Sequence, residues 1–331
     1  MYDVITVGSA TLDVFARTAY SELVKIIDTK GETDLLAYPC GSKILIEELD
    51  FTAGGGGTNT AVAFSRLGHK VAYIGKLGKG TNSDFIHKSL KQEKIDLLCA
   101  HGEGNAGYSI ILDNLEHDRT ILTYKGANDQ LRFREIDIKK VKARWFYFCA
   151  MMNESFNTLE KLAKFAENKK IKIAFNPSAY LAEKGSLHLK QILDRTEVLI
   201  LNKEEAHLLV GQGAPEEVLE KLRRLGPKIA VVTDGKNEIY AMDQNFIYRC
   251  KPPKVKIMDT TGAGDSFGAA FVSGIIKGKT AEFAIGLGVA NACSNLAEYG
   301  AKTGLLKYSE ALRYIKRYKI KVTKKKYKRI L

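Results

Sequence analysis

The sequence predicts an α/β protein, a three-layer sandwich in which helices cover both faces of a mainly parallel β-sheet. From about residue 144 onward, short apolar runs alternate with amphipathic stretches of helical length, as repeated strand–helix units do. The runs are apolar at almost every position, which is typical of strands buried on both faces. Several of them end in a polar residue, and the chain opens with a similar run at residues 4–7.

The composition is that of an ordinary soluble globular protein, with 331 residues, 45% hydrophobic and 27% charged. The five cysteines are odd in number and scattered, without a C-x-x-C pair, and the six histidines lack ligand spacing. This argues against a disulfide framework or a zinc site and favours a reducing compartment. Neither a signal peptide nor an apolar run of membrane length is evident. We therefore expect a cytoplasmic protein without membrane partners.

The formal net charge is +13 and much of the excess lies near the C-terminus, in residues 321–329. A basic tail can bind nucleic acid or an anionic surface. More often it is a solvated end that aids solubility. We favour the second interpretation, and expect no nucleic-acid partner, because no recognised nucleic-acid module accompanies the tail.

The first strand, residues 4–7, leads to Asp13. An acid just beyond a parallel strand lies where α/β folds bind ligands. Asp13 could accept hydrogen bonds from sugar hydroxyls or could be a turn residue, and the sequence favours neither. Residues 14–52 contain a strand-like stretch at 43–49 but no strand–helix unit, so we expect an excursion from the main fold, such as a lid.

A first glycine-rich stretch comprises Gly54, Gly55, Gly56 and Gly57 and is followed by Asn59. Bare backbone lets a ligand approach closely, and the Asn59 amide offers both a donor and an acceptor. A flexible turn explains a lone glycine run equally well, and on this motif alone we prefer it. A short helix at 61–67 and a strand at 71–74 follow.

The middle of the chain predicts a helix at 83–92 and two strands, 108–113 and 119–124, which a polar span joins into a hairpin. Residues 126–128 close it. Beyond residue 143, we expect strands at 144–149, 171–175, 198–201 and 229–232, and helices at 153–168, 215–225 and 281–298. The polar strand ends at Asn176, Asn202 and Thr233 should line one edge of the sheet.

The second glycine-rich stretch, residues 258–267, contains Gly262, Ala263, Gly264 and Asp265 and runs into a helical pattern. Such a turn at a helix N-terminus presents unpaired N–H groups and the positive end of the helix dipole to an anion. An acid at its rim can take a proton beside a bound phosphate. The motif therefore predicts phosphoryl transfer with Asp265 as the base.

Phosphoryl transfer also needs charge neutralisation and an acceptor pocket. Asn202 and Glu205 follow a strand and suit a hydrated Mg²⁺, which keeps several waters. Asp13 and residues 54–59 could hold acceptor hydroxyls. Each group has a structural alternative: Asp265 as a helix N-terminal acid, and Asn202 with Glu205 as a helix cap.

These motifs resemble the ribokinase (PfkB) family of carbohydrate kinases over most of the chain. Residues 259–267 resemble the C-terminal signature of that family, residues 54–59 with the helix ending at Gly68 resemble its N-terminal signature, and residues 202–205 resemble its N-x-x-E element. The resemblance implies a single ribokinase-like α/β kinase domain over 1–331, with about eight or nine sheet strands. It also implies a small β-lid formed by residues 14–52 and 106–127, and transfer of the ATP γ-phosphate to a sugar hydroxyl.

The resemblance also assigns roles. Asp265 is the base, and Gly262, Ala263 and Gly264 form the anion hole. Asn202 and Glu205 control Mg²⁺, the latter through water, and phosphate. The remaining assignments are Thr233, Gly235 and Asn291 at the nucleotide; Asp13, Gly54, Gly55, Gly56 and Asn59 at the acceptor; and Asp259 and Thr261, with the Gly300 region, at a monovalent cation such as K⁺. A homodimer through the lid is implied as well.

Two features depart from ribokinase itself. Ribokinase usually has lysine where this chain has Gly56, and the stretch from Asp13 to Gly54 is longer, as in adenosine-kinase-like members. We therefore expect a sugar kinase, with a nucleoside kinase as the alternative, in which Phe15 and Tyr108 could stack on a base. A non-catalytic nucleotide-binding protein is a third possibility, but it would be free to lose Asp265 and the glycines. Whether ATP or ADP is the donor stays open.

Overall fold

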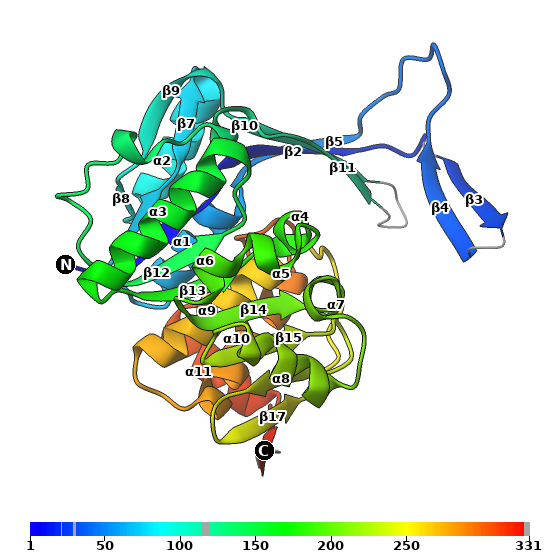
Figure 1. Cartoon of the computed structure of the whole chain (residues 1–331). Coiled ribbons are helices and arrows are strands. Elements are labelled where there is room, and N and C mark those ends of the chain that lie inside the picture. Colours follow the sequence, from blue (N-terminus) through cyan, green and yellow to red (C-terminus); the bar gives the residue numbers. More distant parts are fainter. Residues whose placement is uncertain (21, 29–30, 114–118, 328–331) are drawn as a thin grey trace.

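A ten-stranded sheet forms the centre of the molecule, with the strand order β18-β17-β16-β15-β14-β13-β12-β1-β6-β8 (Figure 1). The computed structural model describes residues 1–20, 22–28, 31–113 and 119–327. The neighbouring strands β15, β14, β13, β12, β1, β6 and β8 are parallel to one another. Strands β16, β17 and β18 extend the sheet beyond β15 with antiparallel pairing. The strands are β1 (Tyr2–Val7), β6 (Val71–Ile74), β8 (Asp96–Leu97), β12 (Ala143–Cys149), β13 (Lys172–Asn176), β14 (Thr196–Asn202), β15 (Ile229–Thr233), β16 (Ile239–Met242), β17 (Phe246–Cys250) and β18 (Val322–Lys326). The α/β class with a mainly parallel sheet is confirmed.

Two separate apolar cores show that helices cover both faces of this sheet. One core includes residues of α1 (Gly56–Arg66), α2 (Thr81–Gln92), α9 (Ala263–Ile276) and α10 (Ala281–Leu296). The other includes residues of α3 (Asn153–Lys169), α6 (Lys190–Leu193), α7 (Lys203–Val210) and α8 (Pro215–Arg224). Strand β12 contributes Trp145 and Tyr147 to the first core and Phe146 and Phe148 to the second, as the alternation of side chains along a strand requires.

The remaining helices are short or peripheral: α4 (Ser178–Ala182), α5 (Gly185–His188), α11 (Tyr308–Arg317), and the 3₁₀ turns η1 (Gly126–Asp129) and η2 (Phe133–Glu135). The helices predicted at 83–92, 153–168, 215–225 and 281–298 correspond to α2, α3, α8 and α10, with ends that agree within two residues. None of the described helices is long and apolar enough to cross a membrane.

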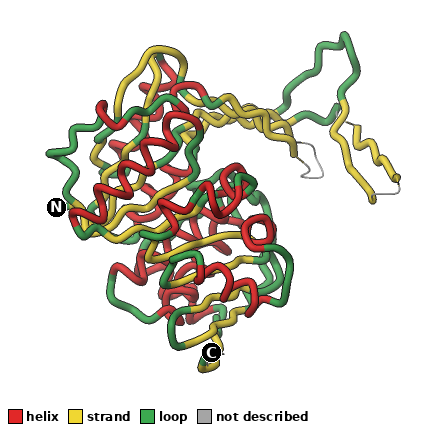
Figure 2. The backbone as a smooth tube through the Cα atoms, viewed as in Figure 1, coloured by secondary structure: helices red, strands yellow, loops and turns green. Residues whose placement is uncertain are grey.

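A second sheet extends away from the body of the molecule (Figures 1 and 2). We call it the projecting sheet; its four strands, in spatial order, are β11 (Arg119–Tyr124), β10 (Gly107–Asp113), β2 (Thr11–Arg17) and β5 (Glu48–Gly54). A hairpin of β3 (Glu22–Asp28) and β4 (Gly31–Ala37) lies beyond its far end. Strands β10 and β11 are antiparallel, as predicted, although their turn at 114–118 lies outside the described residues.

The strand predicted at 43–49 is wrong. Residues 42–47 have no regular structure, and β5 begins only at Glu48, where the backbone starts to pair with Arg17 of β2.

The base of the projecting sheet is fixed by Asn128 in η1. The amide of Asn128 accepts from Ala10 N and donates to Ala10 O, both at 2.9 Å. Strands β7 (Lys76–Lys79) and β9 (Ala100–Asn105) form a small parallel pair beside this base.

The basic C-terminal stretch is partly structured, and its lysines are exposed to solvent, as expected of a solvated end. Residues Val322–Lys326 form β18, which pairs antiparallel with β17 at the edge of the central sheet. A lysine-rich outermost strand hinders edge-to-edge association with another sheet. This is a structural reason for the charge that does not involve a polyanionic partner.

Candidate active site

The two glycine-rich motifs meet at the carboxyl ends of the parallel strands. The first motif is tightly packed against the loop after β1, because a Cβ on Gly57 would lie 2.7 Å from the Gly8 carbonyl carbon. Gly57 N also donates to Ser9 O at 3.1 Å. Gly55 has φ +94°, a conformation that glycine adopts readily. The glycine run is therefore a rigid element of the site and not a loose turn.

Asp265 lies in the first turn of α9 and faces the N-terminal end of α1. Asn59 Nδ2 donates to Asp265 Oδ2 at 2.9 Å, and a Cβ on Gly56 would lie 3.6 Å from Asp265 Oδ1. Burial raises the pKa of Asp265 to about 6, although the Asn59 hydrogen bond and the Lys302 ammonium act in the opposite direction. A carboxylate with a pKa near neutrality can take up a proton at working pH, as a general base must.

The anion hole predicted at Gly262, Ala263 and Gly264 forms the N-terminus of α9. Gly262 is the left-handed N-cap, with φ 74°, and accepts a hydrogen bond from Ser266 N at 2.9 Å. The first turn of a helix leaves N–H groups without intrahelical acceptors. A Cβ on Gly264 would meet nothing within 4 Å, so this turn borders open space. An anion can therefore approach the backbone here.

Asp13 lies within strand β2 and not in a turn, which removes one of its two sequence-based interpretations. The side chain is buried, and Thr11 Oγ1 donates to its Oδ1 at 2.7 Å. A Cβ on Gly54 would lie 1.8 Å from Asp13 Oδ2. Burial raises the pKa of Asp13, while hydrogen bonds from Thr11 and Ser109 and the Lys302 charge oppose the rise. Asp13 thus sits directly over the glycine-rich backbone.

Asn202 and Glu205 form a reciprocal cap at the start of α7. Glu205 N donates to Asn202 Oδ1 at 2.7 Å, and Asn202 N donates to Glu205 Oε2 at 2.9 Å. The capping interpretation is therefore confirmed. It is compatible with a role at a metal, because the cap fixes both side chains at the end of β14 and engages one of the two carboxylate oxygens of Glu205. The Asp265 charge helps to raise the pKa of Glu205, after burial.

A hydrated Mg²⁺ needs few direct protein ligands. No group of three or more histidine, cysteine or acidic side chains suited to a metal occurs in the described ranges. That Asn202 and Glu205 act on such an ion, the latter through water, stays a prediction.

Thr233 and Gly235 lie beside this pair. Thr233 ends β15 in register with Asn202 of β14, and Gly235 occupies the following turn with φ +50°. Asn291 is placed differently: it is fully buried, donates to Ser266 O at 3.0 Å and accepts from Leu306 N at 2.9 Å. The Asn291 amide is therefore bonded to backbone groups of the protein, and its assignment to the nucleotide stays a prediction.

Asp259 fixes the loop before α9. Its Oδ1 accepts from the backbone N and the Oγ1 of Thr261 at 2.8 and 2.7 Å, and its Oδ2 accepts from Gly300 N at 2.9 Å. A Cβ on Gly262 would lie 2.5 Å from Ala301 Cβ. The loop and the Gly300 region are thus adjacent, as the resemblance implied.

Two residues of the site were not found from the sequence. The Lys302 ammonium donates to Ala53 O at 2.5 Å and to Thr58 Oγ1 at 3.0 Å. Cys149 is buried at the end of β12, where its Cβ would lie 3.3 Å from a Cβ on Gly56. Neither residue belongs to a recognisable motif. The tertiary fold brings each of them to the site, so the sequence pattern could not indicate them.

A hollow of about 300 Å³ lies next to the acceptor side of the site, between the projecting sheet and the loop after α10. Phe15, Arg17 and Tyr299 line it. Phe15 and Arg17 follow Asp13 at every second position of β2, so the three share one face of the sheet. Tyr108 pairs with Leu12 and lies on the opposite face. Of the two aromatic residues predicted to stack on a base, only Phe15 is suitably placed.

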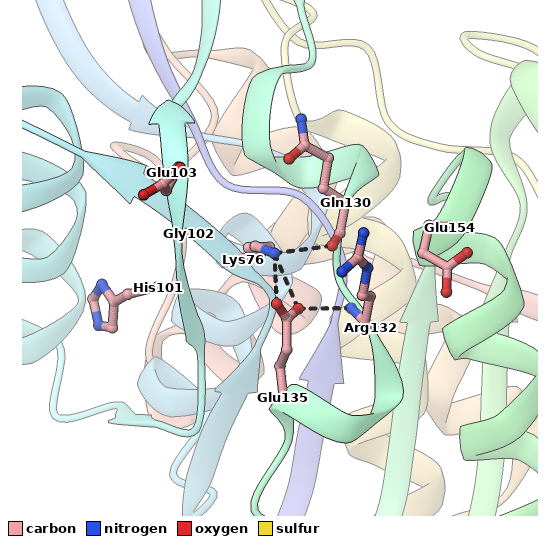
Figure 3. A pocket seen from close by; sticks show the side chains of 8 residues that line it. All are labelled: Lys76, His101, Gly102, Glu103, Gln130, Arg132, Glu135 and Glu154. Atoms are coloured by element: carbon pink, nitrogen blue, oxygen red, sulfur yellow. Dashed lines mark hydrogen bonds and ion pairs between the residues drawn. The ribbon is translucent and has the colours of Figure 1, made fainter.

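A larger hollow of about 430 Å³ lies beside β7 and β9 (Figure 3). Lys76 is buried in its wall and donates to Glu135 Oε1 at 2.8 Å and to Gln130 O at 3.0 Å. The buried cation is therefore neutralised within the protein. This arrangement anchors η2 and does not require a ligand.

Comparison with known proteins agrees with this geometry. The model of the pfkB family of carbohydrate kinases matches residues 20–307. A ribokinase of Lactococcus lactis subsp. lactis is 28% identical over 324 residues, which are 97% of this chain and 99% of the relative. An uncharacterized sugar kinase of Archaeoglobus fulgidus is also 28% identical, over 74% of this chain and 98% of its own.

Solved structures share the fold. A ribokinase from Thermotoga maritima superposes with a TM-score of 0.81 at 22% identity, covering 96% of this chain and 100% of that one. An adenosine kinase from Sinorhizobium meliloti gives 0.79 at 20% identity, covering 94% and 98%. A putative ribokinase II from E. coli, solved with ATP and Mg²⁺, gives 0.81 at 18% identity, covering 96% and 100%. The chain belongs to the pfkB family of carbohydrate kinases, phosphotransferases with an alcohol group as acceptor.

Proposed function

We propose that this protein is an ATP-dependent sugar kinase in which Asp265 deprotonates the acceptor hydroxyl. One observation carries the proposal: the Asp265 carboxylate, bonded to Asn59, faces the same glycine-rich backbone as Asp13. A hydroxyl held by Asp13 and this backbone would lie within reach of the base. The exposed N-terminal turn of α9, at Gly262, Ala263 and Gly264, would stabilise the negative charge on the transferring phosphoryl group.

The same proposal assigns the nucleotide side of the site. ATP would lie along the carboxyl ends of β14 and β15, near Asn202, Thr233 and Gly235. Mg²⁺ would neutralise the phosphate oxygens and be held through water by Glu205. This chain's own residues would then orient the acceptor and receive its proton. A monovalent cation such as K⁺ beside Asp259 and Thr261 stays a prediction from the resemblance.

We also propose that the projecting sheet is the lid of the acceptor site and the surface of a homodimer. One of its faces carries Asp13. On the opposite face, Leu49, Phe51, Leu122 and Tyr124 of the two outer strands are between 49% and 56% exposed. An exposed apolar sheet face of this kind is typical of an interaction surface. A second copy of the chain could cover it.

A nucleoside kinase is the second candidate. The 300 Å³ hollow beyond Asp13 has aromatic residues, Phe15 and Tyr299, in its wall, and could hold a base attached to the sugar. The Arg17 guanidinium lies 4.9 Å from the centre of the Tyr299 ring and 2.7 Å from Glu48, so it partly fills this space.

An ADP-release assay over a panel of sugars and nucleosides, with ATP and with ADP as donor, tests these proposals. Turnover with a free sugar supports the first candidate, and turnover restricted to nucleosides supports the second. ATP binding without turnover on any acceptor would refute both and favour a non-catalytic nucleotide-binding protein. Asp265→Asn should keep ATP binding and lose most of the turnover. A variant that stays near the wild-type rate would show that the base is another group.

A further inference from the structure

Lys302 brings a partly buried ammonium group to the acceptor side of the candidate site from the loop after α10. The ammonium donates to Ala53 O, on the peptide unit next to Gly54, and to Thr58 Oγ1. Asp13 lies over Gly54 and Asp265 lies near Gly56. The ammonium and both carboxylates therefore gather around one short stretch of backbone, residues 53–58.

The position of Lys302 is held by a second set of contacts. Arg66 Nη1 donates to the Lys302 carbonyl at 2.7 Å and to the Leu305 carbonyl at 3.2 Å. The Arg66 guanidinium is itself paired with Glu93, with Nη2 to Oε1 at 2.6 Å. The loop that carries Lys302 is thus fixed to α1, and this constrains the direction of the Lys302 side chain.

Two acidic groups in one partly buried site disfavour each other's charged form, and an opposite charge relieves this. Lys302 is the cation that opposes the rise in pKa of both Asp13 and Asp265. Burial lowers the pKa of Lys302 to about 8, while Asp13, Glu93 and Asp265 act to raise it. At neutral pH the ammonium form is therefore still favoured.

We propose that Lys302 is a positioning residue of the acceptor site, whose ammonium holds the glycine-rich turn in place and supplies the positive charge that Asp13 and Asp265 share. The idea rests on the proposed function only for its effect on turnover. Its electrostatic part concerns the protein alone. Gly56 has no side chain that could provide this charge, so the C-terminal loop provides it.

A simple structural tie between β5 and α1 is the competing explanation, and the variants are chosen to separate the two. Lys302→Met keeps the length of the side chain and removes the charge. Lys302→Ala leaves space that ethylammonium can enter. Lys139→Met, at an exposed lysine, is the matched control.

The first measurement needs no substrate. The thermal stability of the free protein is followed between pH 4 and pH 9 for wild type, Lys302→Met and Lys139→Met. The groups that face Lys302 are Asp13 on β2, Asp265 on α9, Glu93 after α2 and Arg66 on α1. Loss of the ammonium should raise the pKa of both carboxylates in the folded protein further, so low pH favours the folded state more in Lys302→Met than in wild type. The melting temperature of Lys302→Met relative to wild type should therefore be about 2–4 °C lower at pH 7 than at pH 4. A melting-temperature difference between Lys302→Met and wild type that is the same at pH 4 and pH 7 would overturn the proposal.

The second measurement uses an acceptor identified in the panel. Lys302→Met should lower kcat/KM for the acceptor by about a hundredfold, as loss of one preorganised charge does, while the KM for ATP changes little. Ethylammonium should restore part of the activity of Lys302→Ala. A purely structural tie would instead raise both KM values and lower the melting temperature, without recovery by the amine. Wild-type protein that turns over no acceptor would refute the proposed kinase, and the pH dependence of the stability of the free protein would then decide on Lys302.

Discussion

Replacing the proposed base by its neutral isostere should stabilise the protein at neutral pH. Asp265→Asn removes a carboxylate whose pKa burial raises from 3.8 to about 6. The folded protein therefore binds this proton more tightly than the unfolded chain, and the stability that the group contributes falls as pH rises through about 6. A shift of about two units corresponds to about 3 kcal/mol. The asparagine still accepts from Asn59 Nδ2, so the main hydrogen bond survives.

Part of the gain is offset, because the Asp265 charge also supports the Lys302 ammonium. We expect Asp265→Asn to gain about 1–3 kcal/mol at pH 7.5, or roughly 1–4 °C in melting temperature. The gain should shrink as pH falls below 6 and be small near pH 4, where the carboxyl is neutral in both states. Thermal denaturation of wild type, Asp265→Asn and the exposed control Asp137→Asn at pH 7.5, 6 and 4 measures this. A variant that is equal to or less stable than wild type at pH 7.5 would refute the reasoning.

Three further predictions follow from other contacts. The wild-type kcat/KM for the acceptor should fall about tenfold for each pH unit below 6, since only the ionised Asp265 can act as base; a rate unchanged down to pH 5 in a pH–rate profile would contradict this. Gly54→Ala should raise the acceptor KM at least about tenfold, because its Cβ would lie 1.8 Å from Asp13 Oδ2 and a small displacement of a positioning group is costly; separate KM measurements for acceptor and ATP test it, and an equal change in both would count against it. Phe51→Lys should convert the expected dimer into a monomer in light scattering, whereas the control Leu187→Lys on α5 should not; a wild-type monomer would exclude the proposed dimer.

The main sheet could be predicted because strands buried on both faces are recognisable as apolar runs. Runs such as 144–149 and 229–232 have few alternatives in a chain of this length. The stretch at 43–49 shows the limit of such patterns. Its apolar residues fit a strand, but a strand also needs a partner edge. The backbone lies against β2 only from Glu48 onward. The sequence pattern does not show where along the chain such a partner strand comes within hydrogen-bonding distance.

Strand β18 shows the opposite case. Its sequence, Val322–Lys326, contains three lysines, and lysine is depleted in strands. The open edge of β17 supplies the partner that makes a strand of it. Local propensity is overridden here by tertiary context, so this strand could not be predicted from the sequence.

The candidate site likewise contains some residues that could be predicted from the sequence and others that could not. Asp265, Asn59 and the glycines lie in contiguous motifs, so their chemistry could be predicted from spacing. Lys302 bonds to Ala53, 249 residues away in sequence, and nothing in its neighbourhood marks it. Asn291 lies on a buried helix, where its amide fills backbone hydrogen-bonding needs. A buried asparagine and a ligand-binding one are indistinguishable until the fold places them.

The four glycines of the first motif are not equivalent, and the difference bears on how this site is charged. Side chains on Gly54 and Gly57 would collide with Asp13 and with the Gly8 backbone, and Gly55 has a positive φ. Gly56 has neither constraint: its nearest contacts are Cys149 at 3.3 Å and Asp265 at 3.6 Å. A lysine there, as ribokinase usually has, would direct its ammonium toward the base. In this chain Gly56 places no side chain beside Asp265, and the Lys302 ammonium is the positive charge that acts on both carboxylates. The glycine at position 56 therefore leaves room in front of Asp265, and we expect that room to be used by the acceptor.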